Sequence, residues 1–117
     1  MQIPKPTQAD RARFESLVPD DARVEVKPMF GNLAAFIDGN MFMGLFGSDV
    51  GVKLPTSEEE ALRRAGGGPF GPAARPMSGY VSLPATFDAA RAEPWITKSL
   101  AFVASLPPKA KRTSKKR

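Results

Sequence analysis

Residues 29–54 read MFGNLAAFIDGNMFMGLFGSDVGVKL, and this stretch decides the fold. It contains three short apolar runs, at 33–37, 41–46 and 50–54. Asp38-Gly39 separates the first two runs and is a strong hairpin signal, because a type I′ turn needs a positive φ at both central residues. Gly47-Ser48 begins a second reversal of the chain. The stretch therefore predicts an antiparallel meander of three strands.

The middle run of this meander is apolar on both of its faces. Alternation along a strand gives one face with Met41, Met43 and Leu45, and another with Phe42 and Phe46. A strand of this kind is either central and covered twice, or it abuts a partner chain. The pattern predicts a surface for protein contact and leaves open self-association as a homodimer.

Helices are predicted on both sides of the meander. Thr7, with Asp10 three residues later, has the form of a capping box at a helix start. Thr56 or Ser57 is expected to cap a second helix, whose first turn is rich in glutamate. Pro94 is expected at or near the first turn of the last helix, since proline suits that position.

Two further runs, at 24–27 and 80–83, read as strands and bring the predicted number to about five. The predicted fold class is α+β, with an antiparallel sheet, the meander at its centre and flanking helices. A length of 117 residues corresponds to one domain. We expect this domain to cover residues 1–106, followed by a basic tail at 107–117 that is structureless by composition.

The composition excludes several classes of chemistry. The chain has no His and no Cys, so it lacks an imidazole base, a thiolate nucleophile and the ligands of the common zinc sites. No catalytic residue, cofactor or metal is predicted, and we expect a protein that is not an enzyme. No run approaches the ~20 apolar residues of a membrane span. The first residues also lack the apolar core of a signal peptide, so a cytoplasmic location is expected.

The net charge of +5 is concentrated at the end of the chain. Six of the 17 basic residues lie in the last nine positions: Lys109, Lys111, Arg112, Lys115, Lys116 and Arg117. The rest of the chain carries 11 basic and 12 acidic residues and is nearly neutral. Two interpretations of the tail stay open. It is a solubilising disordered segment, or it contacts nucleic acid without regard to sequence.

Three smaller patterns in the sequence are candidate sites. Residues 66–71, GGGPFG, satisfy the dinucleotide pattern GxGxxG, but a predicted helix precedes them and Pro69 blocks a following one. They read instead as a helix end and a loop. Glu58-Glu59-Glu60 suits the positive end of a helix better than a metal site, because adjacent helical positions diverge. Arg75 and Tyr80 flank the loop, and they either contact a ligand or pack at the edge of the core.

Several separated motifs resemble the N-terminal domain of the TfoX/Sxy family. They are Met29-Phe30-Gly31, Asp38-Gly39-Asn40-Met41-Phe42, Val52-Lys53-Leu54, Ala65-Gly66, Pro69-Phe70, Arg75-Pro76-Met77, Tyr80-Val81-Ser82-Leu83-Pro84, and Trp95 followed by Ser105-Leu106-Pro107-Pro108-Lys109. The resemblance runs in order over roughly residues 10–109. It implies a compact α+β domain standing without the C-terminal domain of the founding members. Those members regulate competence genes alongside a DNA-bound activator. The family has no established catalytic residues, so none is carried across.

These observations predict a small regulatory or interaction module that acts by protein–protein contact, with transcription regulation of the competence type as its setting. The expected interaction surface consists of Met41, Phe42, Met43, Phe46, Arg75 and Tyr80. Its partner is another protein or a second copy of the chain, and no membrane is expected. The alternative is a nucleic-acid-associated protein that uses its basic tail. An enzyme is the least favoured of the three.

Overall fold

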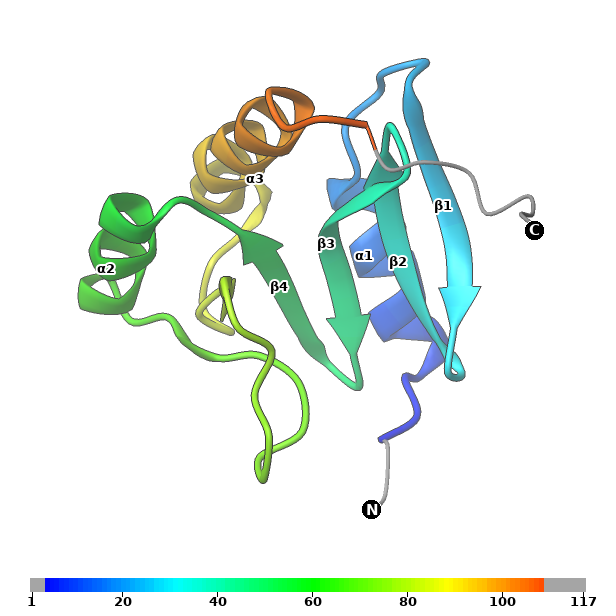
Figure 1. Cartoon of the computed structure of the whole chain (residues 1–117). Helices are drawn as coiled ribbons and strands as arrows, with labels where there is room; N and C mark the ends of the chain where they lie inside the picture. Colours follow the sequence, from blue (N-terminus) through cyan, green and yellow to red (C-terminus); the bar gives the residue numbers. More distant parts are fainter. Residues whose placement is uncertain (1–3, 109–117) are drawn as a thin grey trace.

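The computed structural model describes residues 4–108. Its elements are α1 (Gln8–Leu17), β1 (Val24–Met29), β2 (Asn32–Ile37), β3 (Asn40–Phe46), β4 (Asp49–Lys53), α2 (Thr56–Arg64), β5 (Gly68–Pro69), β6 (Tyr80–Ser82) and α3 (Ala89–Ala104). The strands form one antiparallel sheet in the order β1-β2-β3-β4-β6-β5. Helices α1 and α3 lie behind this sheet in Figure 1, and α2 lies beyond the end of β4. The α+β fold and the central meander are therefore confirmed.

The sheet has one strand more than the five predicted. β5 is only Gly68–Pro69, which pairs with β6 through Gly68 opposite Ser82 and Pro69 opposite Val81. A glycine followed by a proline reads as a loop, because neither residue favours a strand. This short strand stands at the edge of the sheet, which is where proline is tolerated.

The turns of the meander carry the backbone signature that its sequence predicts. Asp38 and Gly39 have φ values of 54° and 81°, so both central residues are left-handed and the type I′ turn is confirmed. A second turn has the same signature and was not predicted. Phe30 and Gly31, with φ values of 52° and 81°, join β1 to β2.

Helix α1 begins with the predicted capping box. The backbone N–H of Asp10 donates to Thr7 Oγ1 at 3.0 Å, and the backbone N–H of Thr7 donates to Asp10 Oδ2 at 2.8 Å. The cap predicted for α2 is wrong. That helix already begins at Thr56, and its N-cap is Pro55, which offers no side-chain hydrogen bond. The glutamates of its first turn supply a favourable charge there.

Helix α3 begins earlier than its proline suggested. Asp88 caps it by accepting a hydrogen bond from the backbone N–H of Arg91 at 2.9 Å, and Ala89 is the first helical residue. Pro94 therefore lies inside the helix and not in its first turn, which corrects the prediction. A proline at the sixth position removes one early intrahelical hydrogen bond, and the helix continues to Ala104.

A β-bulge in β3 overturns the predicted alternation of that strand. Ala35 lies opposite Met43, but the next residue of β2, Phe36, lies opposite Met41, so Phe42 is an extra residue. Phe42 and Met43 are both fully buried in the core on the helical side of the sheet. Met41 faces the other side. The two apolar faces of this strand therefore do not follow a simple period of two.

The main core lies between the sheet and the two helices behind it. Phe14 of α1, Phe42 of β3 and Val103 of α3 are all completely buried there. The Ser99 hydroxyl of α3 donates to the Phe42 carbonyl at 2.7 Å, which satisfies a backbone oxygen that the bulge leaves without a ladder partner. Among residues 4–108, no helix is long and apolar enough to cross a membrane.

Candidate interaction groove on the open face of the sheet

The face of the sheet opposite α1 and α3 is covered only in part. In Figure 1 the segment between α2 and β6 runs alongside β4, at the edge of the sheet away from β1 and β2. The covering segment is anchored by Phe70, which is 2% exposed. This side of the sheet, called the open face below, holds the candidate site.

Two glycines let Phe70 lie directly against the strands. A Cβ on Gly51 of β4 would overlap the Phe70 ring, and a Cβ on Gly44 of β3 would come within 3.3 Å of its Cζ. Glycine inside a strand weakens it, and its use commonly marks a close approach of another group. Here the absence of side chains at the two glycines lets the Phe70 ring pack flat against the sheet, and this ring forms one wall of the groove.

The loop that follows Phe70 is closed by backbone hydrogen bonds. The N–H of Met77 donates to the Phe70 carbonyl at 2.8 Å, and the N–H of Arg75 donates to the Pro72 carbonyl at 3.0 Å. Gly71 permits this closure with a φ of 96°, a value that side chains disfavour. The loop therefore presents Pro72, Arg75 and Met77 from a defined backbone.

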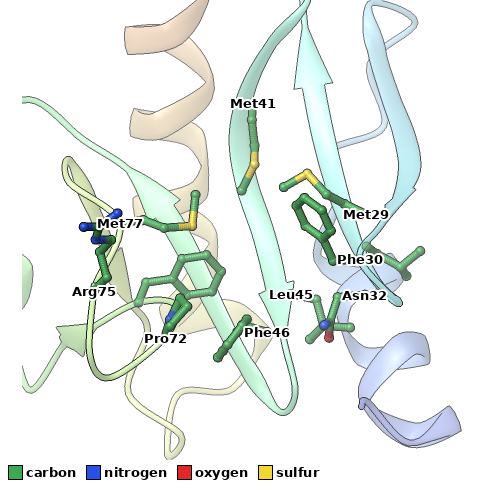
Figure 2. A pocket seen from close by; sticks show the side chains of 11 residues that line it. Met29, Phe30, Asn32, Met41, Leu45, Phe46, Pro72, Arg75 and Met77 are labelled. Carbon is green, nitrogen blue, oxygen red and sulfur yellow. The ribbon is translucent and has the colours of Figure 1, made fainter. Parts of the chain in front are cut away.

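Between this loop and the turn that joins β1 to β2 lies an apolar groove of about 380 Å³. Its lining includes Met29, Phe30, Met41, Phe46, Phe70 and Met77. Figure 2 shows Met77 and Pro72 on one side of the groove, Met41 and Phe46 along β3, and Met29 with Phe30 on the other side. Methionine side chains adapt readily to different apolar shapes, so the lining suits an occupant of variable form.

Phe30 is the most unusual residue of the groove. Its side chain is 78% exposed although it is large and apolar. Its backbone is left-handed, with a φ of 52°, and this conformation costs a residue other than glycine about 1–2 kcal/mol. Asparagine or aspartate is the usual choice at this position of a type I′ turn. Its strain and exposure beside an apolar groove make Phe30 a candidate contact residue.

Arg75 is the only charged residue among the described residues 4–108 that lines the groove. Its side chain is exposed and makes no hydrogen bond or ion pair with any other residue of the range 4–108. An arginine without a carboxylate partner presents five N–H donors to an incoming group. The groove therefore combines an apolar floor with one available cation at its rim.

Tyr80 lies behind the wall of the groove and not at its surface. Its hydroxyl donates to the Met41 carbonyl at 2.9 Å, and its ring centroid lies 6.1 Å from that of Phe70. Burial raises the pKa of Tyr80 to about 12. The neutral phenol thus links β6 to β3 across β4, and the Tyr80 ring supports Phe70, which forms one wall of the groove.

The structure separates the six residues of the predicted interaction surface into three groups. Met41, Phe46 and Arg75 line the groove. Tyr80 supports it from behind. Phe42 and Met43 are fully buried against the helices, so the structure removes them from any accessible surface.

Eight of the eleven residues that line the groove are absent from the predicted surface, and Phe30, Phe70 and Met77 are among them. Phe30 could have been found only from the glycine that follows it between two predicted strands, since Phe-Gly is not one of the usual hairpin pairs. Phe70 and Met77 could not, because their place depends on how the loop folds back over the sheet.

The other patterns in the sequence form no site in the described residues. Gly66, with a φ of 113°, follows the last turn of α2, and Gly68–Pro69 enters a strand, so the GxGxxG match is only a helix end and a loop. Glu58 pairs with Lys98 at 2.9 Å. No group of three or more acidic side chains that could hold a metal occurs in residues 4–108. Of the tail predicted at 107–117, residues 109–117, with all six of its basic side chains, lie outside the described residues.

A comparison with family models decides the relationship. The model of the TfoX N-terminal domain matches residues 15–103 of the 117-residue chain. The chain belongs to this family. The match spans the whole meander, the loop of the groove and most of α3, so the groove is built entirely from the TfoX N-terminal domain. No curated protein and no solved structure matches the chain.

Proposed function

We propose that this TfoX N-terminal domain is a regulatory interaction module that binds another protein through the groove on its open face. The observation that carries the proposal is the placement of Phe30, an exposed and strained aromatic residue, beside an apolar groove of about 380 Å³. Residues that dominate protein interfaces are enriched in aromatic side chains and arginine around well-packed pockets. Phe30 and Arg75 supply both kinds of residue at one site.

The chemistry of the groove supports binding over catalysis. Its lining is apolar except for Asn32 and Arg75, and arginine stays protonated at all ordinary pH values. Asn32 is itself occupied, since its Oδ1 accepts from the Gly47 N–H at 2.9 Å and its Nδ2 donates to the Pro4 carbonyl at 3.2 Å. A groove of this composition recognises shape and charge and offers no general acid or base.

The setting of the proposal comes from the family. The TfoX/Sxy regulators that the chain resembles act on competence genes together with a DNA-bound activator. We therefore place this module in transcription regulation of the competence type, in the cytoplasm, with its contact made to a protein of that machinery. A second copy of the chain is the other partner that fits an apolar open face.

Site-specific photo-crosslinking in cells that produce the protein tests this function. Benzoylphenylalanine replaces Phe30 in one variant and Thr97, an exposed residue of α3, in the control. We expect discrete protein adducts from position 30 that are absent from position 97, because α3 lies on the other side of the sheet (Figure 1). Absence of adducts at position 30, or the same adducts from both positions, would contradict the proposal.

Nucleic-acid association is a second candidate, favoured by the six basic residues at positions 109–117. Such a tail would release counterions from DNA, so its binding would weaken steeply with salt. Fluorescence anisotropy of duplex DNA across a salt series, with the full chain and a chain ending at Pro108, tests this candidate. Salt-dependent binding that requires the tail would support it, and no binding by the full chain would exclude it.

A further inference from the structure

The groove has a definite size that limits its occupant. A cavity of ~150 Å³ in a protein core holds one benzene molecule. At about 380 Å³, the groove has room for roughly two groups of that size. Two large apolar side chains from one short segment fill such a space, whereas a single small side chain leaves much of it empty.

The charges around the groove favour an acidic occupant. Alternation places Glu25 and Lys27 of β1 on the open face, and they neutralise each other at an N–O distance of 3.7 Å. Alternation along β4 also places Asp49 and Lys53 on this face, and the loop adds Arg75. Arg75 is the one that reaches the groove, and it has no partner among residues 4–108.

The exposure of Phe30 favours a protein segment over a small molecule. A small ligand seated in the groove leaves most of a side chain that is 78% exposed in contact with water. A polypeptide that continues beyond the groove covers this ring as well. Contacts of this kind, with an aromatic anchor at the edge of an apolar pocket, stabilise peptide complexes.

We propose that the groove receives a short acidic segment of the partner protein, in which two large apolar side chains enter the groove and a flanking carboxylate pairs with Arg75. This inference rests on the proposed function and adds the chemistry of the partner. Arginine binds carboxylates with two parallel hydrogen bonds, so Arg75 fixes the direction in which the segment lies. The apolar side chains supply the affinity, and the carboxylate supplies the selectivity.

The methionines of the chain provide a direct readout. Three of the five, Met29, Met41 and Met77, line the groove, whereas Met43 is fully buried on the opposite side of the sheet. With methyl-¹³C methionine in the full chain, the groove and the core give separate NMR signals. Binding in the groove moves the first three signals and leaves that of Met43 in place.

The titration uses two blocked peptides that differ only in charge, acetyl-ELFE-amide and acetyl-KLFK-amide. We expect the acidic peptide to shift the three groove methyls with a Kd of about 1 mM, typical of a short flexible ligand. The basic peptide is expected to bind about fivefold more weakly, as for one exposed ion pair. The variant Arg75→Glu reverses this order. Arg91→Glu makes the same change of charge on α3, behind the sheet, and leaves the order unchanged.

Each result separates this inference from the proposed function. Equal shifts with the two peptides, or an order that Arg75→Glu does not alter, would overturn the acidic segment while leaving an apolar groove that binds protein. Shifts with neither peptide would also overturn it, and the crosslinks from position 30 would then decide the proposed function separately. Movement of Met43 together with the other signals would show a change of the whole fold instead of binding in the groove.

Discussion

The two faces of the sheet carry similar apolar side chains, but these side chains are buried on one face and partly exposed to solvent on the other. Behind the sheet, α1 and α3 bury Phe14, Phe42 and Met43 completely. On the open face, a single loop covers part of the strands and leaves Met41 and Phe30 in contact with solvent. We expect residues on the first face to stabilise the fold and residues on the second face to bind a partner protein. Composition alone does not tell them apart.

The largest difference should appear when one residue of each face is truncated. Phe14→Ala leaves a cavity in the closed core and should lower the free energy of unfolding by about 3–5 kcal/mol. Met41→Ala removes a partly exposed side chain and should cost about 1 kcal/mol or less. Urea unfolding followed by circular dichroism measures both. Equal losses for the two variants would contradict the division into a closed and an open face.

Substitution of a glycine that packs against Phe70 should lower stability nearly as much. Gly51→Ala places a methyl group against the ring and should destabilise the fold by about 1–3 kcal/mol, as overpacking does. The matched control is Gly68→Ala, where the new Cβ meets only Ser82 Oγ at 3.5 Å. Thermal unfolding compares the two. An effect of Gly51→Ala no larger than that of the control would show that the contact of Phe70 with the sheet is loose.

A substitution at the turn should separate stability from binding. Phe30→Asn places a residue suited to the left-handed conformation at a φ of 52° and should raise the free energy of unfolding by about 1 kcal/mol. The same change should greatly weaken binding of the protein that crosslinks to position 30, because it removes the exposed phenyl ring. The control Phe30→Val is expected to lose stability, because a β-branched residue fits this backbone poorly. A loss of stability in both variants would indicate that Phe30 packs in the fold.

The smallest effect concerns alkaline pH. Burial raises the pKa of Tyr80 from 10.0 in the reference state to about 12 in the folded state. The neutral phenol is therefore favoured by folding, and its contribution is complete below pH 10 and lost as the pH rises toward 12. Urea midpoints should fall over this range, and Tyr80→Phe should lessen the fall. An unchanged pH profile in that variant would place the cause elsewhere.

The sequence was sufficient for the parts of the fold that depend on local rules. The type I′ turn at Asp38-Gly39 and the capping box at Thr7 follow from backbone preferences of single residues, and both were predicted. The resemblance to the TfoX N-terminal domain was also visible in separated motifs. These features need no knowledge of what packs against them.

The groove needed the structure, because it depends on contacts between distant residues. The bulge at Phe42 reverses the face of the sheet that Met41 occupies, and no residue near it in the sequence predicts a bulge. Phe70 reaches its place because Gly44 and Gly51 lie side by side in the sheet, which the spacing of the two in the sequence does not show. The sequence therefore predicts the strand correctly, but it places Met41 and Phe42 on the wrong faces of the sheet.

The accessibility of Met41 relative to Met43 tests the central claim most directly. Both methyl groups are observed by NMR in the dilute full chain labelled with methyl-¹³C methionine, before and after addition of a soluble paramagnetic agent. The account predicts strong broadening of the Met41 signal and little change in that of Met43, since the bulge places them on opposite faces. Equal protection of the two methyls would mean that the groove is closed in solution and would contradict the account.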